Sequence, residues 1–226
     1  MELCPIKKQL MVYNKGIYTH YTRLTTFNQQ LTTKKNMLLQ ITTTHQPATD
    51  LGYLLHKRPG KFQTKKLSFG NAHVFYPEAN TEKCTAALWI DINSVKLSKG
   101  RNQQFSKSFQ LAQYVNDRPY VASSFMSTAI AKYYGSALNG NCKDRPELAK
   151  TAIPLEIKLV SVNVRGGESL IKDLFEPLGY KVESEGAPLN ENFPDWGDSP
   201  YFKITLRGTL TVQEVLTHLY LSLIHI

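Results

Sequence analysis

The side chains that could supply a nucleophile, a general base or a metal ligand are six histidines and three cysteines. Metal sites usually need such side chains clustered at helical or alternating spacing. Only Glu214 and His218 have helical spacing, and the Glu214 carboxylate is already explained as a helix cap. His45 and His73 end or lie in predicted strands, where a hydrogen-bonded structural histidine is the simpler interpretation. A hydrolytic or nucleotidyl site formed by these two histidines stays open as an enzyme-class alternative.

The cysteines and glycines give little support for catalysis. Cys4, Cys84 and Cys142 are widely spaced and odd in number, without a C-x-x-C pair, which favours free thiols in a reducing compartment and argues against structural zinc. Neither Cys84 nor Cys142 has a neighbouring base in the sequence, so inert thiols are favoured. No glycine pattern of a phosphate loop or a dinucleotide fold occurs. Gly166–Gly167 beside Arg165 is either a turn before a helix or an anion site at its N-terminus.

Basic residues that alternate with aromatic residues are a stronger indication, because cations contact RNA phosphates and aromatic rings stack on unpaired bases. The chain has 226 residues and a net charge of +9, and residues 1–36 hold six basic residues against Glu2 alone. The rest holds 21 basic and 17 acidic residues, a mild excess typical of a solvated surface. The alternative is that Tyr120 and Tyr133 are core residues and that two Asp-Arg pairs are local salt bridges. The candidate contacts for RNA or a protein partner are Asp117, Arg118, Lys143, Asp144, Arg145, Arg165, Trp196 and Arg207.

Several of these candidates flank the best-specified helix of the chain, within residues 113–149. Pro119 suits a first helical turn, because its fixed φ fits the helix and its missing N–H would be unpaired there anyway. An apolar stripe then recurs every four residues from Val121 to Tyr133. Gly135 can supply a left-handed residue that ends the helix. The spacing therefore predicts a core helix over residues 119–134.

The other elements follow from apolar period and turn residues. Alternation or apolar β-branched runs predict strands, and capped runs at helical period predict helices. Thr211 and Glu214 form a capping box before the last helix. The expected strands are residues 37–44, 67–77, 85–92, 154–164, 180–183 and 201–206, and the expected helices begin near residues 50, 119, 168 and 211. This order predicts an α+β fold of mainly antiparallel sheets packed with a few helices, with two related βαββ-type layers.

Composition also divides the chain. Residues 1–36 are polar and without period, which predicts a disordered or non-native leader, while residues 37–220 form the folded domain. Residues 221–226 read LSLIHI, which matches the translation of a transposase-adapter sequence and is expected to be an artefactual tail. No run of about 18 apolar residues exists to span a membrane, so a cytoplasmic protein is expected.

Six long strings between residues 37 and 220 carry a family resemblance. They are ITTTHQPATDLGYLLHK (41–57), FGNAHVFYPEA (69–79), CTAALWIDI (84–92), YVNDRPYVASSFMSTAIAKYYGSALNGNCKDRPELA (114–149), LFEPLGY (174–180) and FPDWGDSPYFKITLRG (193–208). Together they resemble the amino-terminal half of the bacterial 3′-terminal RNA ribose 2′-O-methyltransferase. The resemblance implies a module that engages and activates a bacterial polynucleotide kinase–phosphatase–ligase during RNA repair.

In that family the carboxy-terminal half binds S-adenosylmethionine and a divalent metal and methylates RNA. Its glycine motif and Glu/His metal cluster do not occur in this chain, so the resemblance assigns no catalytic, cofactor-binding or metal-binding residue here and implies a methyltransferase domain that is absent from this sequence. The leading hypothesis is a non-catalytic, ligase-activating and RNA-associated module. An autonomous RNA-binding domain without a protein partner is the alternative, and it predicts binding that weakens steeply with salt.

Overall fold

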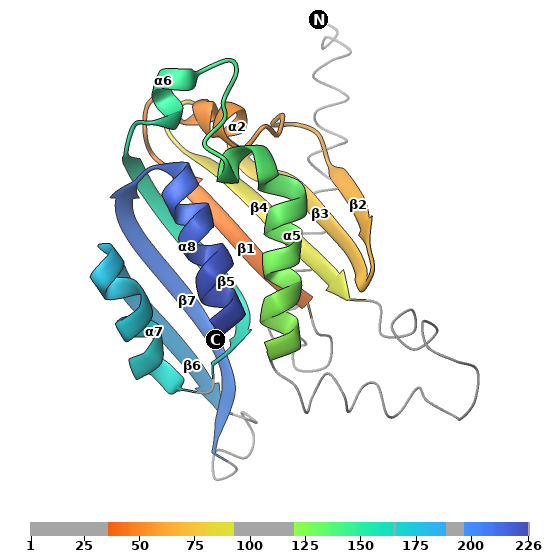
Figure 1. The fold of residues 1–226 in the computed structure, drawn as a ribbon, viewed down its shortest axis with the longest axis vertical. Helices are drawn as coiled ribbons and strands as arrows, with labels where there is room; N and C mark the ends of the chain where they lie inside the picture. Colours follow the sequence, from red (N-terminus) through yellow and green to blue (C-terminus); the bar gives the residue numbers. More distant parts are fainter. Residues whose placement is uncertain (1–35, 93–119, 165, 189–196, 226) are drawn as a thin grey trace, which may run out of the picture. The chain divides into compact units, whose positions relative to one another are not determined.

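A seven-stranded antiparallel sheet forms the centre of the computed structural model, which describes residues 36–92, 120–164, 166–188 and 197–225. The strand order is β2-β3-β4-β1-β5-β7-β6 (Figure 1). The strands are β1 Asn36–Thr43, β2 Gln63–Leu67, β3 Gly70–Ala79, β4 Cys84–Ile92, β5 Ile153–Asn163, β6 Lys181–Pro188 and β7 Asp198–Leu210. The helices are α2 Leu51–Leu54, α5 Tyr120–Leu138, α6 Pro146–Ala149, α7 Gly167–Phe175 and α8 Val212–His225, with 3-10 turns η2 Ala48–Asp50 and η3 Glu176–Leu178.

The two halves of the chain share this sheet, because β1 of the first half pairs with β5 of the second half. Ile41 lies opposite Ile157 in that ladder, and both side chains are buried. The predicted α+β class with mainly antiparallel strands is therefore confirmed. The repeated order of elements continues one sheet instead of building a second one.

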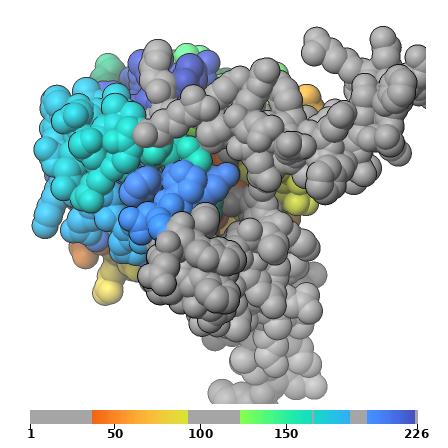
Figure 2. Space-filling model, turned by 90° about the horizontal axis from the view of Figure 1, so that it is seen from below, coloured from red at the N-terminus to blue at the C-terminus, as the bar shows by residue number. Residues whose placement is uncertain are grey.

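The core lies between the sheet and the helices on one of its faces. On β5 the alternating Leu155, Ile157 and Leu159 point into this core, as the sequence predicted, and each is almost fully buried. Helices α5, α7 and α8 lie on that face (Figure 1), and the cyan-to-blue second half of the chain makes up one side of the domain seen from below (Figure 2). No helix of the described residues covers the other face.

A hairpin replaces the single strand predicted over residues 67–77. The chain turns at Ser68 and Phe69, so that β2 and β3 pair with Leu67 opposite Gly70. The Phe69 side chain is buried, and its ring stacks on Phe125 of α5 with centroids 4.1 Å apart. The sequence prediction was wrong here because an apolar turn residue that packs on a distant helix looks like the interior of a strand.

Helix α5 also extends past its predicted end. Tyr134 has non-helical angles (φ −112°, ψ 19°), but the helix resumes and ends at Leu138. Gly135 is not left-handed, and the left-handed glycine after the helix is Gly140 (φ +67°). The buried Tyr134 and Ala137 side chains explain the extra turn, because it adds apolar contact with the core.

Helices α7 and α8 have the predicted end signals. Gly179 is left-handed (φ +88°) after η3, as expected for a helix stop. At the start of α8 the Thr211 N–H donates to Glu214 Oε2 (2.9 Å), and the Glu214 N–H donates to Thr211 Oγ1 (3.1 Å). The bonds that the Thr211 N–H and the Thr211 hydroxyl donate to the Glu214 carboxylate lower the pKa of this carboxyl. The capping box predicted from the sequence is therefore confirmed.

Candidate nucleic-acid interface

A one-turn helix and the segment that follows it build the candidate site. Leu51, Leu54 and Leu55 bury the inner side of α2, so its outer side and residues 56–62 reach the surface. The chain reverses after the helix, where the Lys57 N–H donates to the Gly52 carbonyl (2.9 Å). Pro59 then packs on Gly52 so closely that a β-carbon at Gly52 would lie 2.8 Å from Pro59 Cδ. A glycine at this position therefore allows the segment to fold back over α2.

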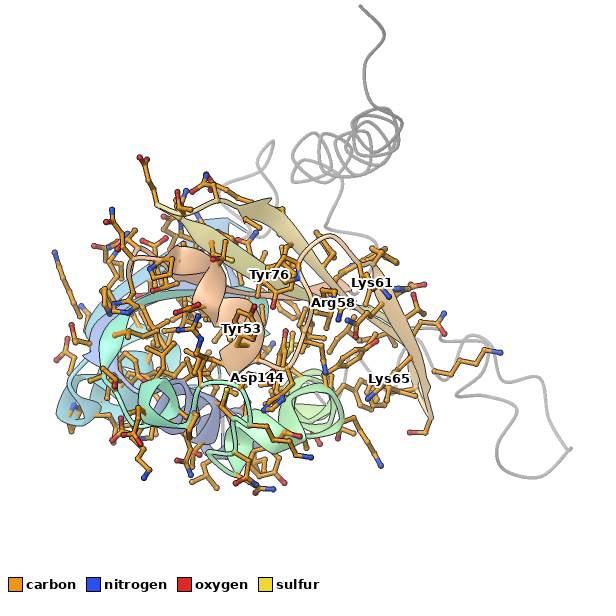
Figure 3. All side chains as sticks on the ribbon, turned by 90° about the horizontal axis from the view of Figure 1, so that it is seen from above. Tyr53, Arg58, Lys61, Lys65, Tyr76 and Asp144 are labelled. Atoms are coloured by element: carbon orange, nitrogen blue, oxygen red, sulfur yellow. The ribbon has the colours of Figure 1, made fainter. Side chains whose placement is uncertain are left out.

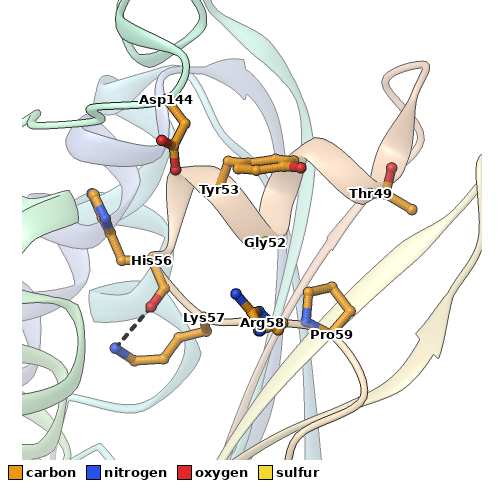
Figure 4. A pocket seen from close by; sticks show the side chains of 8 residues that line it. All are labelled: Thr49, Gly52, Tyr53, His56, Lys57, Arg58, Pro59 and Asp144. Carbon is orange, nitrogen blue, oxygen red and sulfur yellow. Dashed lines mark hydrogen bonds between the residues drawn. The ribbon is translucent and has the colours of Figure 1, made fainter.

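A pocket of about 450 Å³ lies where this segment meets the connection from α5 to α6. Its wall holds one acidic side chain, Asp144, against the cationic side chains of Lys57 and Arg58 (Figure 4). The ring of Tyr53 lies at the pocket with nearly half of the residue exposed (46%). The lining residues are Thr49, Gly52, Tyr53, His56, Lys57, Arg58, Pro59 and Asp144. A basic pocket beside an exposed aromatic ring suits a phosphate and an unpaired base.

The predicted residues Lys143, Asp144 and Arg145 are brought to this pocket by contacts with α2. His56 Nε2 donates a hydrogen bond to the Asn141 carbonyl, and Cys142 Sγ donates to the Tyr53 carbonyl (3.6 Å). These two contacts hold the connection from α5 to α6 against the outer side of α2. The structure therefore joins two segments that are distant in the sequence and that both resemble the family.

Arg145 has a structural role at this junction. Its guanidinium lies 3.8 Å from Asp50 Oδ1, and the Asp50 side chain is only 8% exposed. The same guanidinium lies over the Tyr53 ring, 5.6 Å from the ring centroid. The expected local salt bridge of the Asp144-Arg145 pair is absent among the described residues, because Arg145 pairs with the more buried Asp50 instead.

Replacing Arg145 with alanine is expected to lower the free energy of unfolding by about 1–2 kcal/mol, because a nearly buried Asp50 carboxylate loses its counter-charge. Half of the Arg145 side chain is exposed, which keeps the cost below that of a fully buried pair. Urea denaturation measures the change. The double variant Asp50→Asn/Arg145→Ala should recover most of the loss, and an equally unstable double variant would contradict this role for the pair.

Apart from Arg145, the cations of the described residues fall into two sets that differ in their partners. Six cations away from the pocket pair with glutamates at 2.6–3.9 Å: Lys83, Lys158, Lys172, Lys181, Lys203 and Arg207. A second set forms no ion pair with any described residue: Lys57, Arg58, Lys61, Lys65, Lys66, Lys132, Lys143 and Lys150. This second set lies on the segment after α2, on β2, on α5 and beside α6 (Figure 3). Among the described residues, the cations without an acidic partner therefore gather on these segments.

Arg207 lies elsewhere, on the face of the sheet opposite the core. Its Nε donates to Glu156 Oε2 (2.7 Å) and its Nη1 to Glu183 Oε1 (2.6 Å), across three neighbouring strands. Hydrogen bonds from Lys158 and Arg207 lower the pKa of Glu156, and the bond from Arg207 lowers the pKa of Glu183. The structure does not bring Arg207 together with the Lys143–Arg145 segment, and its charge is already neutralised.

The two histidines of the enzyme alternative are far apart. His73 lies level with Leu38 across β4, whereas His45 follows Thr43 at the other end of β1. At about 3.3 Å per residue along a strand, Leu38 and Thr43 are about 16 Å apart. His73 instead bonds Thr64 Oγ1 (2.9 Å) and stacks on Trp89 (4.9 Å between centroids). The hypothesis of a shared hydrolytic site is therefore wrong, and His73 has a structural role.

The cysteines of the described residues are free and buried. Burial raises the pKa of the Cys84 thiol to about 11, which keeps it protonated and unreactive at neutral pH. Within the described ranges no three His, Cys, Asp or Glu side chains gather in a geometry that could hold a metal ion. None of the helices described is long and apolar enough to cross a membrane.

Four predicted contact residues, Asp117, Arg118, Arg165 and Trp196, lie outside the described residues. Residues 1–35 of the leader predicted over residues 1–36 also lie outside them, whereas Asn36 is the first residue of β1. The sequence prediction missed the cations of the segment after α2. Their signal is visible in the sequence: between Leu51 and Pro77 there are five basic residues and no acidic residue. The small net excess of the whole chain concealed this local imbalance.

These observations define an α+β domain with helices on one face of a sheet and a concentrated basic surface beside a pocket. Over residues 37–226 the sequence matches a family described as the RNA repair, ligase-Pnkp-associating, region of Hen1. The chain belongs to this family.

Two solved structures are similar to the chain. The first, "Structure of the Pnkp1/Rnl/Hen1 RNA repair complex", contains a chain with 14% identity and a TM-score of 0.49, and the match covers 83% of this chain and 42% of that one. The second, "Structure of Pnkp1/Rnl/Hen1 complex", gives 13% identity and a TM-score of 0.46, with 83% and 41% covered. The chain thus spans less than half the length of either. A comparison with curated proteins gave no match.

Proposed function

We propose that this chain binds and activates a polynucleotide kinase–phosphatase–ligase and also contacts RNA, as the amino-terminal module of a bacterial RNA 2′-O-methyltransferase. The observation that carries the proposal is the family match over residues 37–226, because the family is described by its association with the ligase. The basic surface beside the pocket supports the RNA part of the proposal, since its cations Lys57, Arg58, Lys61 and Lys65 have no acidic partner among the described residues.

The module acts by association in this proposal. S-adenosylmethionine and a divalent metal serve the methyltransferase half of the family, and the described residues offer no cluster of metal ligands that would fit a metal here. The buried free thiols suit the reducing cytoplasm, where we place the protein. The candidate contacts are Lys143 and Asp144 at the pocket, together with Asp117, Arg118, Arg165 and Trp196; Arg145 contributes by holding Asp50.

Mixing the purified chain with the ligase is expected to give co-elution in size-exclusion chromatography and faster sealing of nicked RNA, by several-fold at saturating chain. A folded basic protein of similar size and charge serves as the control for non-specific attraction. Circular dichroism and a cooperative melt establish that the sample is folded. A folded chain that neither co-elutes with the ligase nor changes its sealing rate would overturn the proposal.

A further inference from the structure

The ring of Tyr133 on α5 is fixed beside the basic surface. The residue is buried, its hydroxyl donates to the Ala72 carbonyl on β3 (2.6 Å), and the Gln63 carbonyl on β2 lies 3.3 Å away. Burial raises the pKa of the Tyr133 hydroxyl to about 12, so it stays a hydrogen-bond donor at neutral pH. The hairpin of β2 and β3 therefore holds this ring in one position.

Two lysine ammonium groups approach that single ring from different segments. Lys57 Nζ lies 5.8 Å and Lys65 Nζ 4.9 Å from the ring centroid of Tyr133. Each ammonium donates to one neutral carbonyl, Lys57 to His56 (3.3 Å) and Lys65 to Lys132 (2.9 Å). An ammonium has three donors, so each lysine keeps donors for a ligand.

The two lysines share one ring without a counter-charge. Neither forms an ion pair with a described carboxylate, and their positive charges repel each other. Burial, and after it the charge of Lys65, lowers the pKa of Lys57. The sheet lysines Lys158, Lys181 and Lys203 instead each face a glutamate. An anion that bridged the two ammonium groups would relieve the repulsion.

We infer that Lys57 and Lys65, over the ring of Tyr133, form a binding site for a phosphate group of single-stranded RNA. The inference rests on the proposed contact with RNA and names the residues that make it. A phosphate oxygen accepts strong, charge-assisted hydrogen bonds from ammonium donors. Arg58 and Lys61 lie on the same segment and continue the positive surface for neighbouring phosphates (Figure 3).

Exposed aromatic rings beside the lysines favour RNA over an acidic protein as the occupant. Tyr53, which lines the pocket with Lys57, is 46% exposed, and Phe62, between the two lysines in sequence, is 43% exposed. Unpaired bases stack on such rings, whereas an acidic peptide gains nothing comparable from them. Cations and exposed rings in alternation are the pattern of a surface that follows a single strand.

The test compares RNA binding by the full chain and its variants, measured by fluorescence anisotropy with a labelled single strand of about 12 nucleotides. The variant Lys57→Gln/Lys65→Gln is expected to bind roughly 10-fold more weakly at low salt. The slope of log K against log salt should fall by about 0.7, because the two lysines share one phosphate and each phosphate contact in a single strand contributes about 0.7. The melting temperature should not fall, because a like-charge repulsion is removed.

A matched control removes two cations that already have partners. Lys172 and Lys203 pair with Glu168 and Glu185, so Lys172→Gln/Lys203→Gln removes the same charge and is expected to change RNA affinity by no more than about 2-fold. The variant Lys57→Arg/Lys65→Arg keeps both charges and should retain most of the affinity. Equal weakening by both glutamine pairs would show a non-specific charge effect and overturn the inference.

A comparison of two RNA ligands identifies which phosphate of the RNA binds at the site. If the wild-type chain binds RNA with a 3′-phosphate more tightly than RNA with a 3′-hydroxyl, the site is assigned to a terminal phosphate. This preference should then be lost in Lys57→Gln/Lys65→Gln, and inorganic phosphate should compete with the RNA. Equal binding of the two RNAs, with the same loss, assigns it to the phosphodiester backbone. Unchanged RNA affinity in Lys57→Gln/Lys65→Gln overturns the inference, and a simultaneous loss of ligase co-elution would assign the lysines to the protein partner instead. If the wild-type chain does not co-elute with the ligase, the proposed association with the ligase is refuted. The inference about RNA binding by Lys57 and Lys65 would not be affected.

Discussion

Replacing Gly52 with valine is expected to destabilise the domain by about 2–3 kcal/mol and to weaken RNA binding together with it. A β-carbon at Gly52 would lie 2.8 Å from Pro59 Cδ and 3.1 Å from the Lys57 carbonyl oxygen. The second contact is with backbone, so rotation of a flexible side chain cannot relieve it. The segment that carries Lys57 must therefore move away from α2, which separates Lys57 from the ring of Tyr133.

Urea denaturation and RNA anisotropy measure the two effects on the same sample. Gly135→Ala is the matched control: no atom lies within 4 Å of an added β-carbon, and alanine is the better helix former by about 0.5–1 kcal/mol. Gly135→Ala should therefore stabilise the chain and leave RNA binding unchanged. A Gly52→Val protein with wild-type stability and RNA affinity would show that the folded-back segment does not depend on this glycine.

Replacing Phe175 with alanine is expected to lower the free energy of unfolding by about 3–5 kcal/mol, the largest single effect predicted here. The Phe175 side chain is fully buried and meets Tyr180 edge to face, with centroids 5.9 Å apart. The Tyr180 hydroxyl in turn shares a hydrogen bond with His218 Nδ1 on α8 (3.0 Å). Loss of the Phe175 ring leaves a cavity under α7 and removes support from the contact between Tyr180 and α8.

The same truncation at an exposed ring provides the control. Phe62 is 43% exposed and keeps a stacked contact with Phe75, so Phe62→Ala should cost only about 0.5–1.5 kcal/mol. Denaturation curves with an unchanged slope would show that the folded state, and not the compactness of the unfolded chain, has changed. Equal costs at the two positions would contradict the assignment of Phe175 to the core.

The distribution of ion pairs divides the described surface into paired and unpaired cations. On β5, β6 and β7 the lysines and Arg207 face glutamates, so this part of the surface has little net attraction for an anion. On β2 and the segment after α2, the cations Lys57, Arg58, Lys61, Lys65 and Lys66 have no acidic partner among the described residues, and they retain their charge for a ligand. A module that holds RNA while it contacts a ligase needs separate surfaces for the two, and this asymmetry offers one of them to RNA.

Local features of the fold were determined by the sequence alone. Alternation along β5 depends on the period of a single strand, and the capping box at Thr211 and Glu214 depends on residues three positions apart. Gly179 ended η3 as expected, whereas Gly135 did not end α5, because burial of Tyr134 and Ala137 outweighed a local stop signal. Sequence signals therefore succeeded where the deciding contacts lie within one element.

Only the tertiary structure decided which charges are neutralised. Arg145 pairs with the distant Asp50 and not with its neighbour Asp144. Lys57 and Lys65, from two different segments, both approach the ring of Tyr133 on α5. Coulomb energy and hydrogen bonding depend on separation in space, and folding sets that separation by packing elements that the sequence places far apart. The motifs that resemble the family predicted the family correctly. Which cations lack a counter-charge depends on where the carboxylates of the described residues lie in the fold.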